Sequence, residues 1–337
     1  MRRSPVVLFD VGCSGGIEPY WRHFGSHLTG VGFDALVDEV EYLNAAPGHG
    51  FRYEAALVGC KSYDELFSRA LRDDPIASRD NASFERTSAV ANARLKKLDY
   101  SREAYNRGRP AVYTDCRLDL DDYAAEHGYP KIDFLKTDTD DHDIEVLLGA
   151  RALLRNGCLA AVVECNFRGR HHPAANSFAN IDQLQRGAGF SLFDIEPYRY
   201  TKAALPGRFA DEHPSHTVGG AVQWADAVFA RDFADPDHER KTGYRPTADD
   251  VVKLAVFLDI FGLQDCAAEL LQARRDLIAP VCDVDAALDR ATRNAYGDRL
   301  TYARCVAAFE HDPDRMMPSR AAPPRARWSL SRLLGRS

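Results

Sequence analysis

The feature that most constrains the fold is a short apolar run that ends in an acid and is followed at once by glycines. Residues 5–12 read PVVLFDVG, and the next four residues are CSGG. A β-branched and aromatic run that ends at a turn is typical of a buried strand. The glycines allow the backbone to turn sharply and to approach a ligand near the start of a helix. This segment therefore predicts a strand that leads into a binding loop.

Strand-like and helical segments alternate along most of the chain. A helical pattern over 17–28 leads to a second strand that closes on Asp34, and a helix over 35–46 leads to a third strand over 51–59. After a polar, arginine-rich insertion over about 61–112, the alternation resumes with a strand at 132–138, a helix over 142–157, a strand at 159–167, and a helix and two late strands within 181–231. This pattern predicts an α/β domain over residues 1–235, with about seven mostly parallel strands and helices on both faces.

From residue 247 onward the sequence pattern is helical. One apolar face is formed at i, i+3, i+4 and i+7 by Val251, Leu254, Ala255 and Leu258. Thr247 and Asp250 resemble a capping box at the start of this helix. Residues 247–312 are therefore predicted to be a helical appendage whose apolar face needs a partner.

The last residues, 313–337, form a basic tail. From residue 315 onward the chain has six arginines and no acid, together with three prolines, so a disordered tail is expected. The simplest interpretation is a solvated segment. The alternative is a short amphipathic segment that contacts an anionic membrane surface or an acidic partner through Trp328, Leu330, Leu333 and Leu334.

Composition excludes several classes of protein. The chain has 337 residues and a formal charge of −7, which argues against a nucleic-acid binder because such proteins carry a basic excess. No stretch approaches the roughly 20 apolar residues that a membrane-spanning helix needs. The first apolar run is too short for a signal peptide, and the eight cysteines occur singly, without zinc-type spacing. We therefore expect a cytoplasmic protein with reduced thiols, and the sequence leaves its oligomeric state open.

The glycine loop is the first candidate site. Its cofactor-binding candidates are Asp10, Gly12, Cys13, Ser14 and Gly16, joined by Asp34 at the end of the next strand. An acid at that place binds the ribose hydroxyls in nucleoside-binding folds, although a helix N-cap is the plain alternative for Asp34. The loop does not fit the dinucleotide fingerprint G-x-G-x-x-G, because Ser14 stands where the second glycine belongs. A tight turn without a ligand is the alternative for the loop.

The densest polar cluster is TDTDDHD at 137–143, between a strand and a helix. The candidate catalytic residues here are Asp138, Asp140 and His142, which lie where open α/β sheets bind ligands. Such groups can take a proton from a hydroxyl or bind Mg²⁺ through oxygen, but no metal ligand is predicted. The alternative is a loop of capping and solvated acids. Side chains after the following strand are candidates for lining an acceptor pocket, namely Glu164, Asn166, His171 and His172.

Several segments resemble the FkbM-type methyltransferases, a class I family that depends on S-adenosylmethionine. The likeness covers about residues 5–235 and rests on FDVGCSGG, VGFDALVDEVEYL, LDLDDYAAEHGYPKIDFLKTDTDDHDIEVLLGA and VVECNF. It implies a Rossmann-like class I fold, a cofactor loop at Asp10, Gly12 and Gly16, a ribose ligand at Asp34, and Asp138 at the active-site end of the fourth strand.

The chain departs from the family pattern at two places. The family often has Glu followed by Pro where this chain has Asp34-Ala35-Leu36, and it usually has Gly where Asp141 stands. The resemblance implies methylation of a hydroxyl on a carbohydrate, glycolipid or secondary metabolite, with a small-molecule or glycan acceptor. Two alternatives stay open: a nicotinamide-dependent oxidoreductase on a similar fold, and a non-catalytic module that binds S-adenosylmethionine or partner proteins.

Overall fold

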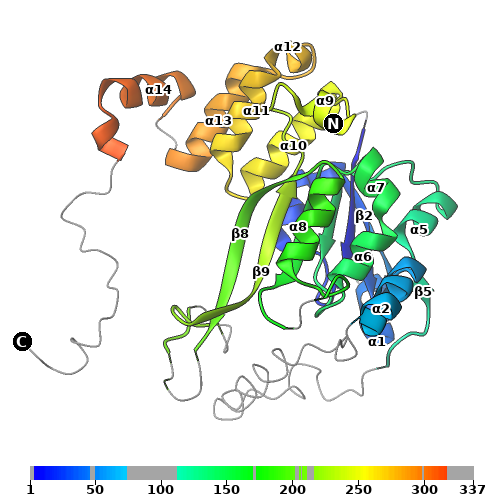
Figure 1. Ribbon diagram of the computed structural model, residues 1–337. Coiled ribbons are helices and arrows are strands. Elements are labelled where there is room, and N and C mark those ends of the chain that lie inside the picture. The colour runs from blue at the N-terminus through cyan, green and yellow to red at the C-terminus, as the bar shows by residue number, and fades with distance from the viewer. Residues whose placement is uncertain are drawn as a thin grey trace, which may run out of the picture.

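The computed structural model describes residues 4–45, 50–73, 112–169, 172–201, 205, 207–210, 216–297 and 300–316 (Figure 1). A seven-stranded sheet forms its centre. In chain order the strands are β1 (Val6–Val11), β2 (Leu28–Asp34), β3 (Phe51–Ala55), β6 (Phe134–Thr137), β7 (Ala160–Asn166), β8 (Ser191–Tyr200) and β9 (Ala221–Ala230). In space their order is β3-β2-β1-β6-β7-β9-β8. β9 runs antiparallel to both of its neighbours, β7 and β8, and the other pairs in this sheet are parallel.

The strand order reverses at β1, which pairs with β2 on one side and with β6 on the other. In open α/β sheets, ligands bind in the crevice beside such a reversal, at the carboxyl ends of the strands. The structure confirms the predicted Rossmann-like class I architecture of about seven mostly parallel strands. It also places the glycine loop, the end of β2 and the acidic turn after β6 at one edge of the sheet.

Helices cover both faces of the sheet, because successive residues of each strand point to opposite sides. One face, with Phe9 and Leu135, packs against α5 (Leu120–Glu126), α6 (Asp143–Gly149), α7 (Arg151–Asn156) and α8 (Phe178–Gly187). The other face, with Leu8 and Phe134, packs against η1 (Pro19–His27), α1 (Val37–Ala45) and α10 (Ala248–Ile260).

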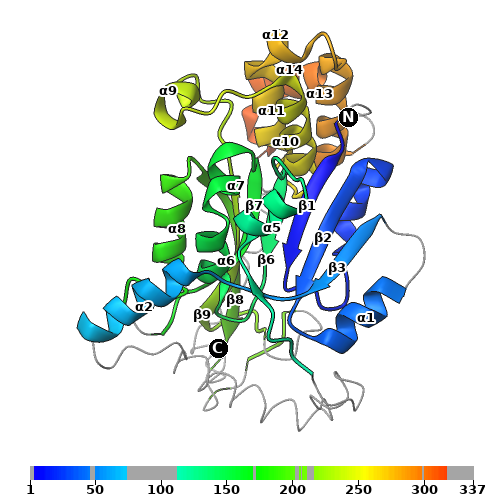
Figure 2. The same cartoon turned by 90° about the vertical axis from the view of Figure 1, so that its right-hand side faces the viewer.

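The C-terminal helices begin beyond α9 (His238–Thr242) and lie near the start of β1, away from the acidic turn (Figure 2). They are α10, α11 (Gln264–Ala273), α12 (Arg275–Ile278), α13 (Val284–Tyr296) and α14 (Tyr302–His311), followed by η2 (Pro313–Met316). The predicted capping box of Thr247 and Asp250 is present at the start of α10.

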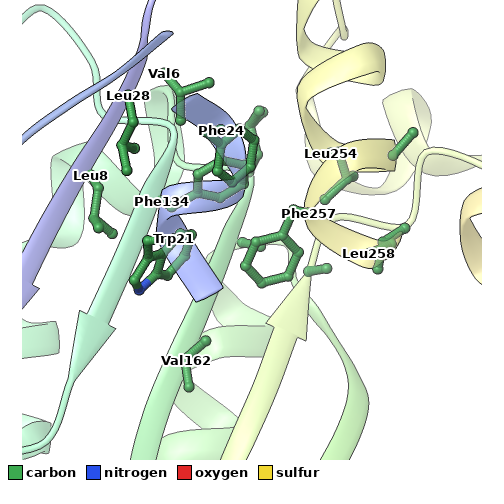
Figure 3. Close-up of a cluster of buried hydrophobic side chains, with 14 of the residues drawn as sticks. Val6, Leu8, Trp21, Phe24, Leu28, Phe134, Val162, Leu254, Phe257 and Leu258 are labelled. Carbon is green, nitrogen blue, oxygen red and sulfur yellow. The ribbon is translucent and has the colours of Figure 1, made fainter. Parts of the chain in front are cut away.

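The partner of the predicted apolar face on α10 is the central sheet. Leu254 and Phe257 pack beside Trp21 of η1 and Phe134 of β6, within one buried cluster (Figure 3). The rings of Phe134 and Phe257 are stacked with their centroids 4.8 Å apart. The apolar face of α10 is thus part of the core beneath the sheet, while the boundaries 1–235 and 247–312 stay predictions.

Three predicted elements differ in detail. The helix at 17–28 is a 3₁₀ helix, interrupted at Gly25, which has φ 58° and ψ −139°. The strand at 51–59 divides, because β4 (Leu57–Val58) leaves β3 and pairs with β5 (Arg117–Leu118) in a separate two-stranded sheet. The single helix at 142–157 is two helices, α6 and α7. The carboxylate of Asp121 accepts hydrogen bonds from the N–H groups of Ala152 and Leu153, which allows a second helix to begin there.

Two predicted regions lie largely outside the described residues. The insertion at 61–112 begins with α2 (Lys61–Asp73), and residues 74–111 are not described. Of the basic tail, only residues up to 316 are described, so its predicted contacts stay predictions. Within the described ranges, no helix combines the length and apolar character needed to cross a membrane.

Candidate functional site

The glycine loop leaves β1 directly beneath the acidic turn. The N–H of Gly12 donates a hydrogen bond to the carbonyl of Phe33, 2.8 Å away, and the N–H of Gly16 donates to Cys13. Gly12 has φ +80°, and a Cβ atom there would lie 1.7 Å from the carbonyl oxygen of Asp138. Glycine at position 12 is therefore required by both backbone conformation and space, because the loop touches the turn after β6.

Asp10 is the most unusual side chain of the site. It is fully buried, and neither carboxylate oxygen has a hydrogen-bond partner in the structure. The ammonium of Lys136 lies 3.4 Å from Oδ1. Burial raises the pKa of Asp10 to about 6, although Lys136 acts in the opposite direction. A buried carboxylate that lacks hydrogen bonds is expected to be completed by a ligand that carries donors or positive charge.

Asp34 ends β2 beside the same loop. Its Oδ1 accepts a hydrogen bond from the N–H of Leu36, 2.8 Å away, so the plain capping role is at least partly present. Burial raises the pKa of Asp34, and the N–H of Ser14 acts to lower it. The structure thus brings Asp34 and the loop together, as the nucleoside-site prediction requires.

The other loop candidates separate into buried and exposed residues. Cys13 is buried in the core cluster that contains Trp21, and burial strongly raises the pKa of its thiol. Its side chain therefore belongs to the core, and the backbone of Cys13 forms part of the loop. Ser14 is exposed, and the N–H of neighbouring Gly15 donates to Glu39 Oε1 at 3.0 Å.

The acidic turn between β6 and α6 has a strained backbone. Asp140 and Asp141 have φ values of +50° and +86°, and they are the non-glycine residues with positive φ in the described part of the chain. Asp141, which replaces the glycine usual in the resembling family, accepts a hydrogen bond from the side chain of Asn166 at the end of β7. Strained residues of this kind cluster at functional sites.

The three predicted catalytic residues do not all meet. The side chain of Asp138 is 53% exposed, and its Oδ2 lies 3.5 Å from Lys136 Nζ, so Asp138 and Asp10 share one cation. Asp140 is exposed on the turn. His142 Nδ1 lies 2.8 Å from Glu145 Oε1 on α6, and this hydrogen bond raises the pKa of the imidazole. His142 is therefore engaged with a helix on the opposite face of the sheet from Lys136.

Two residues that sequence reasoning missed complete the site. Lys136 lies within β6 and donates a hydrogen bond to the carbonyl of Gly12, 3.0 Å away. Asp226 of β9 pairs in register with Glu164 of β7, so both carboxylates are on the same face. Burial raises the pKa of Asp226 to about 6 and also raises the pKa of Glu164. The available signal was a charged residue inside an otherwise apolar strand.

An aromatic pair continues this face on β8 and β9. The rings of Tyr198 and Trp224 stack with centroids 3.6 Å apart, and the Tyr198 hydroxyl lies 3.4 Å from Asp226 Oδ2. His172 is instead buried, and its Nδ1 accepts a hydrogen bond from the N–H of Ala174. His171 lies outside the described residues. Over the ranges that the structure covers, no group of three His, Cys, Asp or Glu side chains is arranged to hold a metal ion.

Comparison with known families identifies the central part of the chain. Residues 42–192 match the sequence model of a family described as the Methyltransferase FkbM domain. The match covers less than half of the 337-residue chain. The matched residues include β6 and the acidic turn, whereas Asp10 and Asp34 precede them. This similarity supports a methyltransferase that uses S-adenosylmethionine as its cofactor.

Other comparisons add little to the FkbM assignment. No curated protein matches the chain significantly. A TehB-like SAM-dependent methyltransferase from Corynebacterium glutamicum is similar in structure, with 13% sequence identity, over 68% of this chain and 81% of its own, at a TM-score of 0.27. A TM-score this low does not establish a shared fold, so the fold assignment rests on the strand order given above.

Proposed function

We propose that the protein transfers a methyl group from S-adenosylmethionine to a hydroxyl group of a carbohydrate, glycolipid or secondary metabolite. The observation that supports this most strongly is the buried Asp10 carboxylate, which lacks hydrogen bonds beside a glycine loop at the reversal of the sheet. The acceptor class rests on the resemblance to the FkbM family.

The residues present fit the cofactor. Asp10 would receive the amino group of its methionine part, the loop from Gly12 to Gly16 would allow its close approach, and Asp34 would accept hydrogen bonds from the ribose hydroxyls. When bound, S-adenosylmethionine supplies an electrophilic methyl group. Methyl transfer is an in-line displacement, so much of the rate depends on how the protein orients donor and acceptor.

Asp138 is the residue that we assign to the proton. Its carboxylate is exposed at the carboxyl end of β6, next to the loop that would hold the cofactor. As the acceptor oxygen attacks, its hydroxyl proton passes to the Asp138 carboxylate, which makes the oxygen a better nucleophile. His142 is a weaker candidate for this role, because its imidazole is held by Glu145.

The first experiment measures cofactor binding by calorimetry. S-adenosylhomocysteine should bind the wild-type protein, and NAD should not, because the loop lacks the dinucleotide fingerprint. Replacing Asp34 by Ala should weaken binding of S-adenosylhomocysteine by about tenfold, through loss of the ribose hydrogen bonds. Binding of NAD in preference to S-adenosylhomocysteine would establish the oxidoreductase alternative and refute the proposal.

The second experiment measures methyl transfer to sugar nucleotides, glycolipids and macrolides. With an acceptor found in this panel, Asp138→Asn should lower kcat by about 100-fold, as expected for loss of a general base. Its affinity for S-adenosylhomocysteine should change by less than about threefold. Full turnover by both Asp138→Asn and His142→Ala would refute the assignment of the base. Cofactor binding without transfer to any acceptor would favour the non-catalytic module.

A further inference from the structure

Lys136 occupies an improbable place for a lysine. It lies in β6, where its neighbours Phe134, Leu135 and Thr137 are buried, and the lysine itself is only 7% exposed. Burial of an ammonium group is costly unless partners compensate for the lost water. This buried position therefore requires acceptors close to the ammonium.

The sheet register supplies these acceptors. Asp10 of β1 is the direct neighbour of Lys136, so both side chains are on one face of the sheet, and Asp138 follows two residues later on the same face. The ammonium lies 3.0 Å from the Gly12 carbonyl oxygen, 3.4 Å from Asp10 Oδ1 and 3.5 Å from Asp138 Oδ2. One cation thus joins the proposed cofactor loop to the proposed proton acceptor.

The charges around Lys136 are mostly negative. Asp10 and Asp138 raise the pKa of Lys136 against the effect of burial, which acts to lower it. The titratable groups that interact with Lys136 or Asp10 come from several elements: Cys13 of the loop, Glu18 and Tyr20 at the start of η1, Asp34 of β2, Tyr53 of β3, Asp138 of the turn and Asp226 of β9. Lys136 is the cation that acts on Asp10, whereas Asp138 and Glu18 oppose its ionisation.

We infer that Lys136 is a positioning residue for methyl transfer, which fixes the Gly12 carbonyl, keeps Asp10 charged for the cofactor, and holds Asp138 at the acceptor side. This inference rests on the proposed function. It assigns Lys136 no contact with the reacting atoms. Its effect is exerted through Asp10, Gly12 and Asp138.

The charge of Lys136 affects the pH dependence of cofactor binding. With Lys136 present, the pKa of Asp10 is about 6, so its carboxylate is mostly charged at pH 7. Without the ammonium, the effect that lowers this pKa is lost, and Asp10 holds its proton to higher pH. The protonated carboxyl no longer attracts the cofactor's amino group. Binding in the variant should therefore require a more alkaline solution than binding in the wild type.

The experiment is calorimetric titration of S-adenosylhomocysteine between pH 5 and pH 9, which needs no acceptor. Wild-type affinity should fall as the pH drops through about 6. In Lys136→Gln, whose amide retains a donor for the Gly12 carbonyl, affinity at pH 7 should fall by at least about tenfold and the midpoint should rise by at least about one pH unit. Lys136→Arg, which keeps the charge, should bind within about threefold of wild type.

Asp10→Asn is the matched control, because it removes the titrating group while it keeps the shape of the side chain. Its weaker binding should show no midpoint near pH 6. Circular dichroism shows whether Lys136→Gln folds. If it does not, the double variant Lys136→Met/Asp10→Asn, which removes both charges, is expected to fold and to bind S-adenosylhomocysteine weakly and independently of pH. A folded Lys136→Gln protein with the wild-type midpoint would overturn the inference. Failure of the wild type to bind S-adenosylhomocysteine would instead refute the proposed function.

Discussion

At the scale of single residues, Asp141 shows how a side chain can hold a strained backbone. Its φ of +86° lies in the region that favours glycine, yet its carboxylate accepts a hydrogen bond from buried Asn166. Nearby, Asn176 donates to Asp143 Oδ2 and accepts from the N–H of Ile144. Two asparagine side chains from the segment around β7 thus fix the acidic turn and the start of α6.

Replacement of Asp141 separates the hydrogen bond from the charge. Asp141→Asn keeps an oxygen that can accept from Asn166. It also removes one negative charge from a turn that contains three other aspartates, so the free energy of unfolding should rise by about 0.5 kcal/mol. Asp141→Ala removes the bond and leaves a Cβ at positive φ, so stability should fall by about 2 kcal/mol. Thermal denaturation of both variants is the measurement. Equal melting temperatures for Asp141→Ala and wild type would contradict this account.

At the scale of elements, α10 is attached to the sheet by charges as well as by its apolar face. Lys253 and Asp133 are each 1% exposed, and the ammonium lies 2.9 Å from Asp133 Oδ2. The same ammonium donates to the carbonyl of Pro5, at the beginning of β1. Asp133 Oδ2 also accepts the N–H of Val7. This buried ion pair therefore connects α10, the start of β1 and the residue before β6, and Lys131 adds a second link to α10 through Asp250, 2.7 Å away.

Lys253→Met should destabilise the protein by about 3 kcal/mol, because the buried Asp133 carboxylate loses its closest cation and keeps only the more exposed Lys131, 3.8 Å from its Oδ1. Asp133→Asn added to this variant should recover part of the loss. Urea denaturation gives both values. The exposed pair of Lys241 and Asp235 is the matched control, and Lys241→Met should cost less than about 1 kcal/mol. A loss for Lys253→Met as small as for Lys241→Met would show that the buried pair does not hold α10.

At the scale of the whole molecule, buried acids at one edge of the sheet set the pH dependence of stability. Burial raises the pKa of Asp10 and Asp226 to about 6 and of Asp143 to about 7, and it also raises that of Glu164. A carboxyl whose folded pKa exceeds its unfolded pKa binds its proton more tightly when folded. Its contribution to folding stability is complete below the pKa of the unfolded state and is lost as the pH rises through the pKa of the folded state.

Stability should therefore increase as the pH falls from 8 to about 5, raising the melting temperature by about 3–5 °C. Two groups with lowered pKa values act in the opposite direction. His238 reduces stability once the pH falls below the ordinary pKa of histidine, and Asp250 reduces stability in more acidic solution. Thermal denaturation in buffers of equal ionic strength is the measurement. Glu164→Gln should flatten the slope, because it removes one of the four acids. A lower melting temperature at pH 5.5 than at pH 8 would contradict the raised pKa values assigned to these buried acids.

The sequence predicted the local parts of the fold well, for reasons that are themselves local. Apolar periodicity located the strands and α10, and the capping box of Thr247 and Asp250 was read directly from residue spacing. The division of 142–157 into α6 and α7 was missed, since the carboxylate that caps α7 belongs to Asp121, about 30 residues earlier in the chain. The structure brings Asp10, Asp34 and Asp138 to one edge of the sheet, and their roles in binding and catalysis stay predictions.

By itself, therefore, the sequence determined which segments become strands and helices, because side-chain periodicity and turn residues act over a few positions. The tertiary structure alone decided which charges meet. Lys136 reaches Asp10 because β6 lies beside β1, and Asp226 reaches Glu164 because β9 enters the sheet next to β7. Coulombic interactions between buried groups depend on these distances across strands, which no spacing along the chain specifies.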